Sequence, residues 1–204
     1  MSPASSRAEQ KEATRARVLA AAAALFGEHG FASTTVRDIA AEAGVSVGTV
    51  MAVGDKAAIL VELFDRRIAA LHSARAGRPP RPTSGARPAD DVLALFAPFV
   101  EAFTADAELA RHYAAALVSG RHRAGVFDEL AGVLRREIAD VLTGHGFPPA
   151  RAERAATAVH LAYLGTLFLG AGSGTAELGG PAADLATAVE LVLESGGQPE
   201  RKPS

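Results

Sequence analysis

The sequence contains no cysteine and no tryptophan, and only 5% of its 204 residues are aromatic. Without cysteine the chain can form no disulfide framework, no thiolate zinc site, no iron–sulfur cluster and no cysteine nucleophile. Signals for β-strands are also scarce. There is no long alternation of apolar and polar residues, and no Asn-Gly or Asp-Gly pair that would predict a tight hairpin. Structure built mainly from strands is therefore not expected.

The chain also has no large excess of charge of either sign, because its formal net charge is only −2. The charges are nevertheless unevenly placed. Residues 73–87 hold four arginines and no acidic side chain, whereas residues 88–204 hold nine basic and 15 acidic side chains. The C-terminal part therefore repels polyanions on average, and we expect any contact with a nucleic acid to come from the N-terminal part.

Long hydrophobic runs are rare. The polar start, MSPASSRAEQKEATRAR, lacks the apolar core of a signal peptide, which predicts a cytoplasmic protein. Residues 155–176 contain no Asp, Glu, Lys or Arg, and their length would suffice to span a bilayer. His160 lies within this stretch, however, and the stretch ends in the loop-like GAGSGTA. We interpret it as a buried helix that ends near Leu169.

Apolar residues recur at helical spacing throughout the chain and predict an all-α protein of about nine helices. The segment RAGRPPRPTSGARP, residues 75–88, is rich in Pro, Gly and Arg and cannot supply a buried face, so it is predicted to be a linker. It separates a three-helix domain (1–55) and a connecting helix (56–74) from a helical bundle (89–204).

The most specific pattern lies in TVRDIAAEAGVSVGTVMAV, residues 35–53. It predicts two short helices that Thr35 and Ser46 can cap, with Gly44 at the turn between them. This is a helix-turn-helix, whose second helix fits the DNA major groove, about 12 Å wide. Any two short helices with a glycine turn share the pattern, so taken alone it leaves a purely structural role open.

Residues 14–64 resemble the DNA-binding domain of the tetracycline-repressor (TetR) family of bacterial transcription regulators. The most specific pieces are GF at 30–31, TTVRDIA at 34–40, AGVS at 43–46 and GT at 48–49. The resemblance implies a homodimer that presents two recognition helices to an inverted-repeat operator. The expected DNA-binding residues are Thr35, Arg37, Ser46, Val47, Gly48, Thr49, Met51 and Lys56, with Lys11, Arg15 and Arg17 as further candidates for phosphate contacts.

The sequence MAVGDK departs from the family pattern, which usually has an aromatic pair and then Ser-Lys at this place. Met51 stands where a Tyr is typical; it cannot donate a hydrogen bond, but it can contact a thymine methyl group. Lys56 matches the family's phosphate-contacting lysine. Because only Ser46 and Thr49 can hydrogen-bond within residues 46–53, we expect specificity to depend on methyl contacts, backbone positioning and DNA shape.

By the same resemblance, residues 89–204 bind a small ligand and form the dimer. A His or Tyr on an apolar helix can anchor a ligand in an aromatic-lined pocket, although core packing is the alternative for each such residue. The candidate helices for the dimer interface are 150–169, apolar almost all round, and 181–194. The candidate ligand-binding residues are Phe96, Phe99, Phe103, His112, Tyr113, Phe127, His160 and Tyr163.

These features predict a transcription regulator, by family default a repressor, that a small and largely apolar or aromatic effector releases from DNA. An enzyme is not expected, because the sequence has no His-x3-His pair, no G-x-S-x-G motif and no phosphate loop. Neither a metal nor a cofactor is expected, and no membrane partner. The alternative is a helical small-molecule-binding protein of the same fold with weakened or lost DNA binding, which the MAVGDK departure leaves open.

Overall fold

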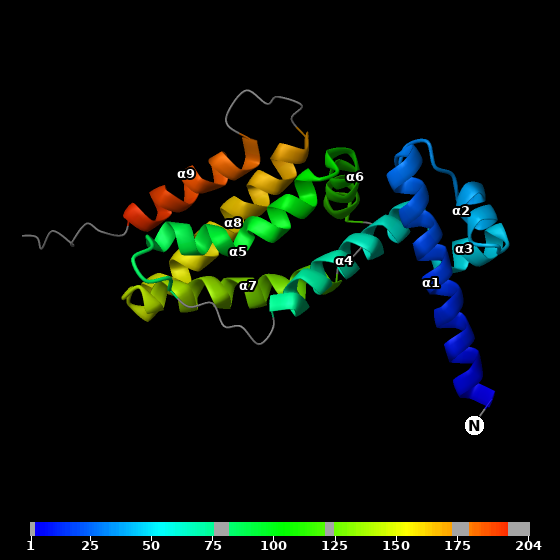
Figure 1. The fold of residues 1–204 in the computed structure, drawn as a ribbon, viewed down its shortest axis with the longest axis horizontal. Helices are drawn as coiled ribbons and strands as arrows, with labels where there is room; N and C mark the ends of the chain where they lie inside the picture. The colour runs from blue at the N-terminus through cyan, green and yellow to red at the C-terminus, as the bar shows by residue number, and fades with distance from the viewer. Residues whose placement is uncertain (1–2, 76–81, 121–124, 173–179, 196–204) are drawn as a thin grey trace, which may run out of the picture. The chain divides into compact units, whose positions relative to one another are not determined.

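The computed structural model describes residues 3–75, 82–120, 125–172 and 180–195, and within these residues the chain forms nine α-helices and no strand (Figure 1). The predicted all-α class, with a helix-turn-helix near the N-terminus and a helical C-terminal part, is confirmed. The helices are α1 (Pro3–His29), α2 (Val36–Glu42), α3 (Val47–Val53), α4 (Lys56–Arg75), α5 (Pro88–Thr104), α6 (Ala107–Val118), α7 (Gly125–Gly144), α8 (Pro149–Gly172) and α9 (Gly180–Glu194).

The chain divides into two compact units, and the division does not follow the predicted boundaries. The N-terminal unit comprises Met1–Arg67 and Ala107–Ala124, and the C-terminal unit comprises Ile68–Asp106 and Gly125–Ser204. Helix α6 therefore belongs with α1, α2, α3 and the first part of α4, not with the predicted bundle 89–204.

Aromatic contacts explain why α6 joins the N-terminal unit. Tyr113 of α6 is fully buried and stacks on Phe64 of α4, with 4.4 Å between the ring centroids. Its hydroxyl donates a hydrogen bond to Oδ1 of Asp65 over 3.3 Å. His112, the preceding residue, packs against the ring of Phe31 at 4.4 Å. Because Phe64 needs an apolar cover, α6 completes the core of this unit.

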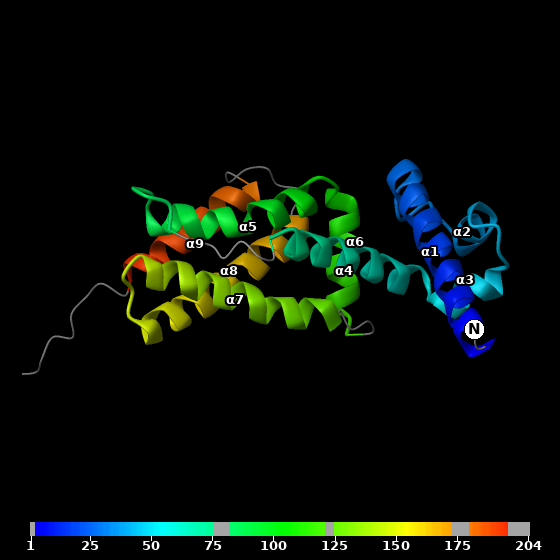
Figure 2. The ribbon, with the colours of Figure 1, turned by 60° about the horizontal axis from the view of Figure 1, so that its bottom comes forward.

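The core of the N-terminal unit forms where α2 and α3 pack against α1 (Figure 2). Val18 and Phe26 of α1, Ile39 of α2 and Val50 of α3 are all nearly or completely buried there. Helix α1 runs through Gly27 to His29, because a glycine inside a helix costs only about 1 kcal/mol relative to alanine.

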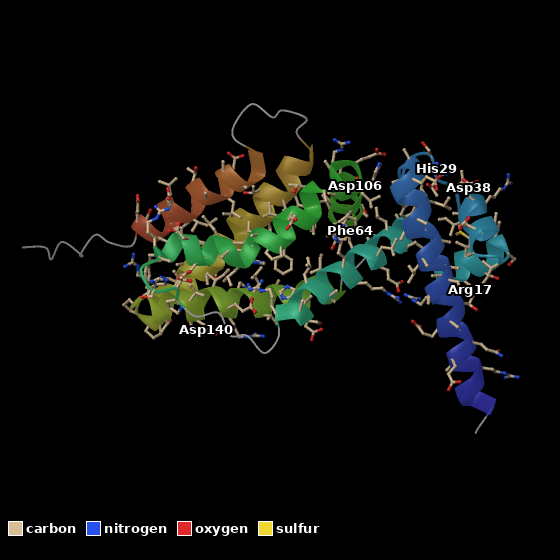
Figure 3. The ribbon with its side chains drawn as sticks, in the orientation of Figure 1. Arg17, His29, Asp38, Phe64, Asp106 and Asp140 are labelled. Carbon is tan, nitrogen blue, oxygen red and sulfur yellow. The ribbon has the colours of Figure 1, made fainter. Side chains whose placement is uncertain are left out.

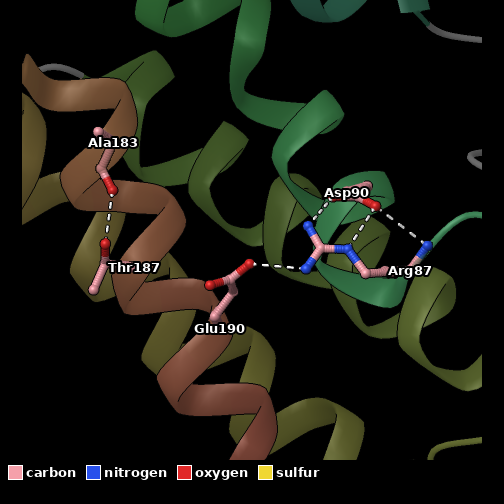
Figure 4. Close-up of polar contacts among 5 residues, drawn as sticks. All are labelled: Arg87, Asp90, Ala183, Thr187 and Glu190. Atoms are coloured by element: carbon pink, nitrogen blue, oxygen red, sulfur yellow. Dashed lines mark hydrogen bonds and ion pairs between the residues drawn. The ribbon is translucent and has the colours of Figure 1, made fainter. Parts of the chain in front are cut away.

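In the C-terminal unit α8 packs against α7 and α9, and α5 packs against α7, α8 and α9. The buried side chains come from all four helices and include Phe96, Ile138, Val159 and Val189. At the start of α5 the exposed Arg87 pairs with Asp90 at 2.7 Å and with Glu190 of α9 at 3.0 Å (Figure 4). Such exposed ion pairs contribute little stability, so apolar burial holds this unit together.

Helix α8 ends at Gly172, three residues beyond the predicted end near Leu169. Its apolar face is largely covered by α7 and α9. None of the helices in the described parts of the chain is both long and apolar enough to cross a membrane. The predicted interpretation of this stretch as a helix, rather than as a membrane span, is in keeping with that finding.

Candidate nucleic-acid interface and ligand cavity

The start of α2 is fixed by a reciprocal cap between Thr35 and Asp38. The Thr35 hydroxyl accepts a hydrogen bond from the Asp38 amide at 3.3 Å, and the Asp38 carboxylate accepts one from the Thr35 amide at 2.8 Å. The Thr35 hydroxyl, which donates to Asp38 Oδ2 at 2.7 Å, and the Thr35 amide together hold the pKa of Asp38 below its usual value. The predicted capping role of Thr35 is confirmed, and its amide and hydroxyl are both engaged in the cap.

The turn between α2 and α3 depends on Gly44, which has a φ of +62°. The Gly44 amide donates to the Ala41 carbonyl at 3.2 Å, and the Val45 amide donates to the Ala40 carbonyl at 3.0 Å. These two bonds form a Schellman motif, which closes a helix with a residue in the left-handed conformation. The glycine therefore fixes the direction in which the chain enters α3.

Helix α3 begins at Ser46, whose side-chain oxygen accepts a hydrogen bond from the Thr49 amide at 3.1 Å. The hydroxyls of Ser46 and Thr49 also bond to each other at 2.8 Å. Val50 is completely buried, whereas Val47 and Met51 are 43% and 51% exposed. Residues four apart lie on the same face of a helix, so these two apolar side chains share one face turned to solvent.

Lys56, the first residue of α4, is bonded within the N-terminal unit. Its ammonium group donates to the carbonyls of Phe31 and Thr34, both at 2.8 Å, and lies 4.3 Å from the centroid of the Phe31 ring. An ammonium has three N–H donors, so one remains for the phosphate contact that the sequence predicts. The two internal bonds tie the loop before α2 to the start of α4.

Basic side chains from α1 lie beside α3. Arg7, Lys11 and Arg15 line a groove of about 570 Å³ together with Thr49 and Ala52 of α3. Glu12 lines the same groove, so it is not lined by basic residues alone.

Two of the basic candidates occupy particular surroundings. Arg15 forms two hydrogen bonds to the carboxylate of Glu62, one of them 2.8 Å long. Arg17 lies on α1 (Figure 3). It lines a second concavity with Glu42 and Ala43 at the end of α2. Arg37 of α2 is exposed. The structure thus brings Lys11 and Arg15 next to Thr49 of α3. Arg17 instead lies beside the end of α2, and Arg37 is part of α2 itself.

The C-terminal unit contains a small cavity with a volume of about 20 Å³. This is room for about one water molecule, whereas small-molecule sites usually measure about 300–1,000 Å³. The cavity is therefore nearly closed, and a larger ligand requires it to widen. Its lining residues are Ile68, His72, Phe99, Phe103, Leu130, Ala131, Leu134, His160, Tyr163 and Leu164.

The predicted ligand-binding residues divide into three groups. Phe99, Phe103, His160 and Tyr163 line the cavity, and Phe96 stacks on Tyr163 with 4.5 Å between ring centroids. His112 and Tyr113 do not join them, because they belong to the N-terminal unit. The side chain of Phe127 lies outside the described residues.

The remaining lining residues, among them His72 in the last turn of α4, were not predicted from the sequence. The signal in the sequence was His72 itself, a polar residue on the otherwise apolar face of this helix, four positions after Ile68.

His160 is the most unusual polar group of the cavity wall. It is 5% exposed, and its Nδ1 has no hydrogen-bond partner among the described residues. Burial, with a smaller effect from the charge of Arg135, lowers the pKa of His160 to about 4. Burial also lowers the pKa of His72 and raises that of Tyr163. The cavity wall is therefore uncharged at neutral pH.

No set of three or more His, Asp or Glu side chains with the geometry of a metal site occurs in the part of the chain that the structure describes. Polar groups of the cavity wall are limited to the two histidines and Tyr163. The arrangement offers an apolar space with a few hydrogen-bonding groups, the usual composition of a small-molecule site.

Comparison with known proteins identifies the N-terminal unit. Residues 18–52, which run from α1 through most of α3, match the sequence model of bacterial regulatory proteins, tetR family. No protein with curated annotation matches the chain.

Solved structures share the fold over most of the chain. A TetR transcriptional regulator from Rhodococcus sp. RHA1 is 17% identical, with a TM-score of 0.62 over 90% of this chain and 97% of that one. FadR from Thermus thermophilus, a TetR-family transcriptional repressor in complex with lauroyl-CoA, is 23% identical, with a TM-score of 0.61 over 93% and 98%. FadR from Bacillus subtilis, in complex with stearoyl-CoA, is 17% identical, with a TM-score of 0.52 over 86% and 96%.

At these identities the likeness to solved structures shows the fold, and the family match of residues 18–52 covers the capped helix-turn-helix described above. Residues 18–52 are therefore similar to the tetR family of bacterial regulatory proteins, and the chain shares the fold of the three solved structures.

Proposed function

We propose that this protein is a ligand-responsive repressor that binds an inverted-repeat operator as a homodimer and leaves it when a small, largely apolar effector binds. The observation that carries the proposal is helix α3, which is capped at Ser46, anchored by the buried Val50 and solvent-exposed on its opposite face, within residues that match the family. An exposed, firmly anchored second helix is what a helix-turn-helix needs to enter the major groove.

The charges around α3 support contact with DNA. Helix α3 itself carries no acidic or basic side chain, and the groove beside it includes Arg7, Lys11 and Arg15. Arg37 on α2 is also exposed. Basic side chains that flank a helix in the major groove can neutralise the phosphates on either side of it. Ser46, Val47, Gly48, Thr49 and Met51 then face the bases, and Lys56 offers its third N–H to a phosphate.

The homodimer is proposed from apolar side chains on α8 and α9. Leu161 and Leu191 are 62% and 59% exposed, although their helices are otherwise well packed against each other. Large apolar side chains left in solvent on adjacent helices are typical of a surface that a partner covers. A two-fold axis through this face would bring two copies of the chain, each with its own α3, into one dimer.

Dimerisation through this face is tested by the double substitution Leu161→Glu and Leu191→Glu. Analytical ultracentrifugation is expected to show a dimer for the natural chain and a folded monomer for the variant, because two buried charges per chain oppose association. The matched control is Asp140→Ala on the exposed side of α7. A variant that stays fully dimeric at micromolar concentration contradicts this interface.

The effector site is proposed at the cavity lined by Phe99, Phe103, His160 and Tyr163. Its uncharged wall suits an apolar body, and the two FadR proteins of the same fold bind acyl-CoA molecules. Because the cavity holds only about 20 Å³, an effector must displace part of its wall. Ile68 and His72 belong to α4, the same helix that begins at Lys56, so widening the cavity acts on a helix that both units share.

A ligand shifts the protein between two states only by the difference in its affinity for them. We therefore expect the effector to bind the free protein more tightly than the DNA-bound protein. DNA should weaken effector binding by the same factor by which the effector weakens DNA binding. Titrating lauroyl-CoA, with and without the operator duplex, measures both sides of this reciprocity. Equal affinity of lauroyl-CoA for free and DNA-bound protein would exclude it as the releasing effector.

Selection from a random pool of duplexes, with the full chain at moderate salt, tests the proposed function as a whole. Enrichment of an inverted repeat supports a dimeric, sequence-specific regulator. If a folded dimer enriches no sequence, the alternative applies: a small-molecule-binding protein of this fold that has lost DNA binding. The observation that favours this alternative is Met51, which stands exposed where the family typically has a tyrosine that contacts the DNA backbone.

A further inference from the structure

The outer face of α3 is almost entirely apolar. Only five large hydrophobic side chains are exposed in the described residues, and two of them, Val47 and Met51, lie on this seven-residue helix. Gly48 and Ala52, also exposed, extend the same face. Nothing on it can donate two parallel hydrogen bonds to a base, as Arg, Asn or Gln would.

The two hydroxyls near this face are already engaged. Ser46 accepts the amide of Thr49, and one of the two hydroxyls donates to the other over 2.8 Å. After these bonds a single hydroxyl hydrogen is left for the whole helix. Donation of side-chain hydrogen bonds from α3 to base edges is therefore limited to about one contact.

Gly48 adds an independent observation. It lies inside the helix with an ordinary negative φ, and an added Cβ would meet only the Ser46 Oγ, at a comfortable 3.7 Å. Alanine would fit here and would favour the helix. The protein's own packing does not require glycine at this exposed position, and the absence of a side chain leaves room for a partner's surface to approach the backbone closely.

In the major groove the apolar feature of a base edge is the methyl group of thymine. We propose that α3 reads its operator half-site mainly through thymine methyl groups, packed against Met51 and Val47, with Gly48 allowing the helix backbone to lie close to the bases. The inference rests on the proposed function, in which α3 enters the major groove. DNA is the occupant that the nearby charges fit, because Arg7 and Lys11 line the groove beside Thr49 and Ala52 of α3, and Arg37 is exposed on the neighbouring helix α2.

The test replaces each thymine of the selected duplex by uracil, one position at a time, which removes only the methyl group. Binding of the full chain is expected to weaken about 4-fold at each contacted thymine, the value for one buried methyl group. In Met51→Ala this sensitivity should disappear at one position of each half-site and remain at the others. The matched control Asp140→Ala, an exposed alanine substitution in the other unit, should keep the natural pattern.

Gly48→Ala supplies a second readout. The variant is expected to unfold at a higher urea concentration than the natural chain and yet to bind the duplex at least 10-fold more weakly. A duplex that is bound equally well with thymine or uracil at every position overturns this inference and leaves the proposed function standing. If no duplex is enriched at all, the proposed function fails, and this inference fails with it.

Discussion

Lys56 allows the sharpest separation of a structural role from a DNA-binding role. Replacing it by methionine keeps most of the apolar stem and removes the charge. The change deletes two hydrogen bonds from a charged donor, to the carbonyls of Phe31 and Thr34, and the contact with the Phe31 ring. Bonds to charged groups are worth about 1.5–3 kcal/mol each when buried, and cation–π contacts about 0.5–1 kcal/mol. Because Lys56 is partly exposed, we expect a loss of about 2–4 kcal/mol.

Urea unfolding, followed by circular dichroism, measures this loss, and Lys11→Met on the exposed surface of α1 is the matched control. The salt dependence of operator binding gives the second readout. A lost phosphate contact lowers the slope of log K against log salt by about 0.9, whereas a purely structural lysine leaves the slope unchanged. Unchanged stability together with a lower slope would refute the structural reasoning and make Lys56 a phosphate ligand first.

Three further predictions follow from the backbone and from buried ionisable groups. Gly44→Ala should lower the free energy of unfolding by about 1–2 kcal/mol, because Gly44 has a φ of +62°. Gly27→Ala, inside a helix, should raise the free energy of unfolding by about 0.5–1 kcal/mol. Equal effects of the two substitutions in urea unfolding would contradict this reasoning. Burial raises the pKa of Asp65 to about 6, so stability should fall as pH rises from about 4 to 6, and Asp65→Asn should flatten that part of the stability profile. The pKa of His160 is lowered to about 4, which has the opposite consequence: stability should fall as pH drops from about 6.5 to 4. A His160→Leu variant that still loses stability over this pH range would exclude His160 as the cause.

The elements that the sequence predicted well are those fixed by neighbouring residues. The caps at Thr35 and Ser46 involve partners three positions along the chain, and the left-handed Gly44 closes α2 through bonds that span at most five residues. Such features depend on local chemistry, which the sequence displays directly. The start of α4 at Lys56 was predicted from apolar residues at helical spacing, which is also a local pattern.

The features that the sequence did not predict depend on distant partners. Periodicity showed that Tyr113 has to be buried, but not that its neighbour is Phe64 and that α6 therefore leaves the predicted bundle. Likewise, the apolar faces of α4 and α7 were visible, whereas their meeting at one cavity with His160 was not. Lys56 matched a family pattern by position, but its bonds to the preceding loop form only in the folded structure.

The discontinuity of the N-terminal unit has a consequence for the order of folding during synthesis. Helices α1, α2 and α3 can fold as soon as they leave the ribosome, but Asp65 and Tyr113 are 48 positions apart. At about 5–20 residues per second, roughly 2–10 s pass between the two. During that interval Phe64 of α4 lacks the ring of Tyr113, on which it stacks in the folded protein. The DNA-binding part of the chain therefore emerges first and is completed later, after α5 has been made.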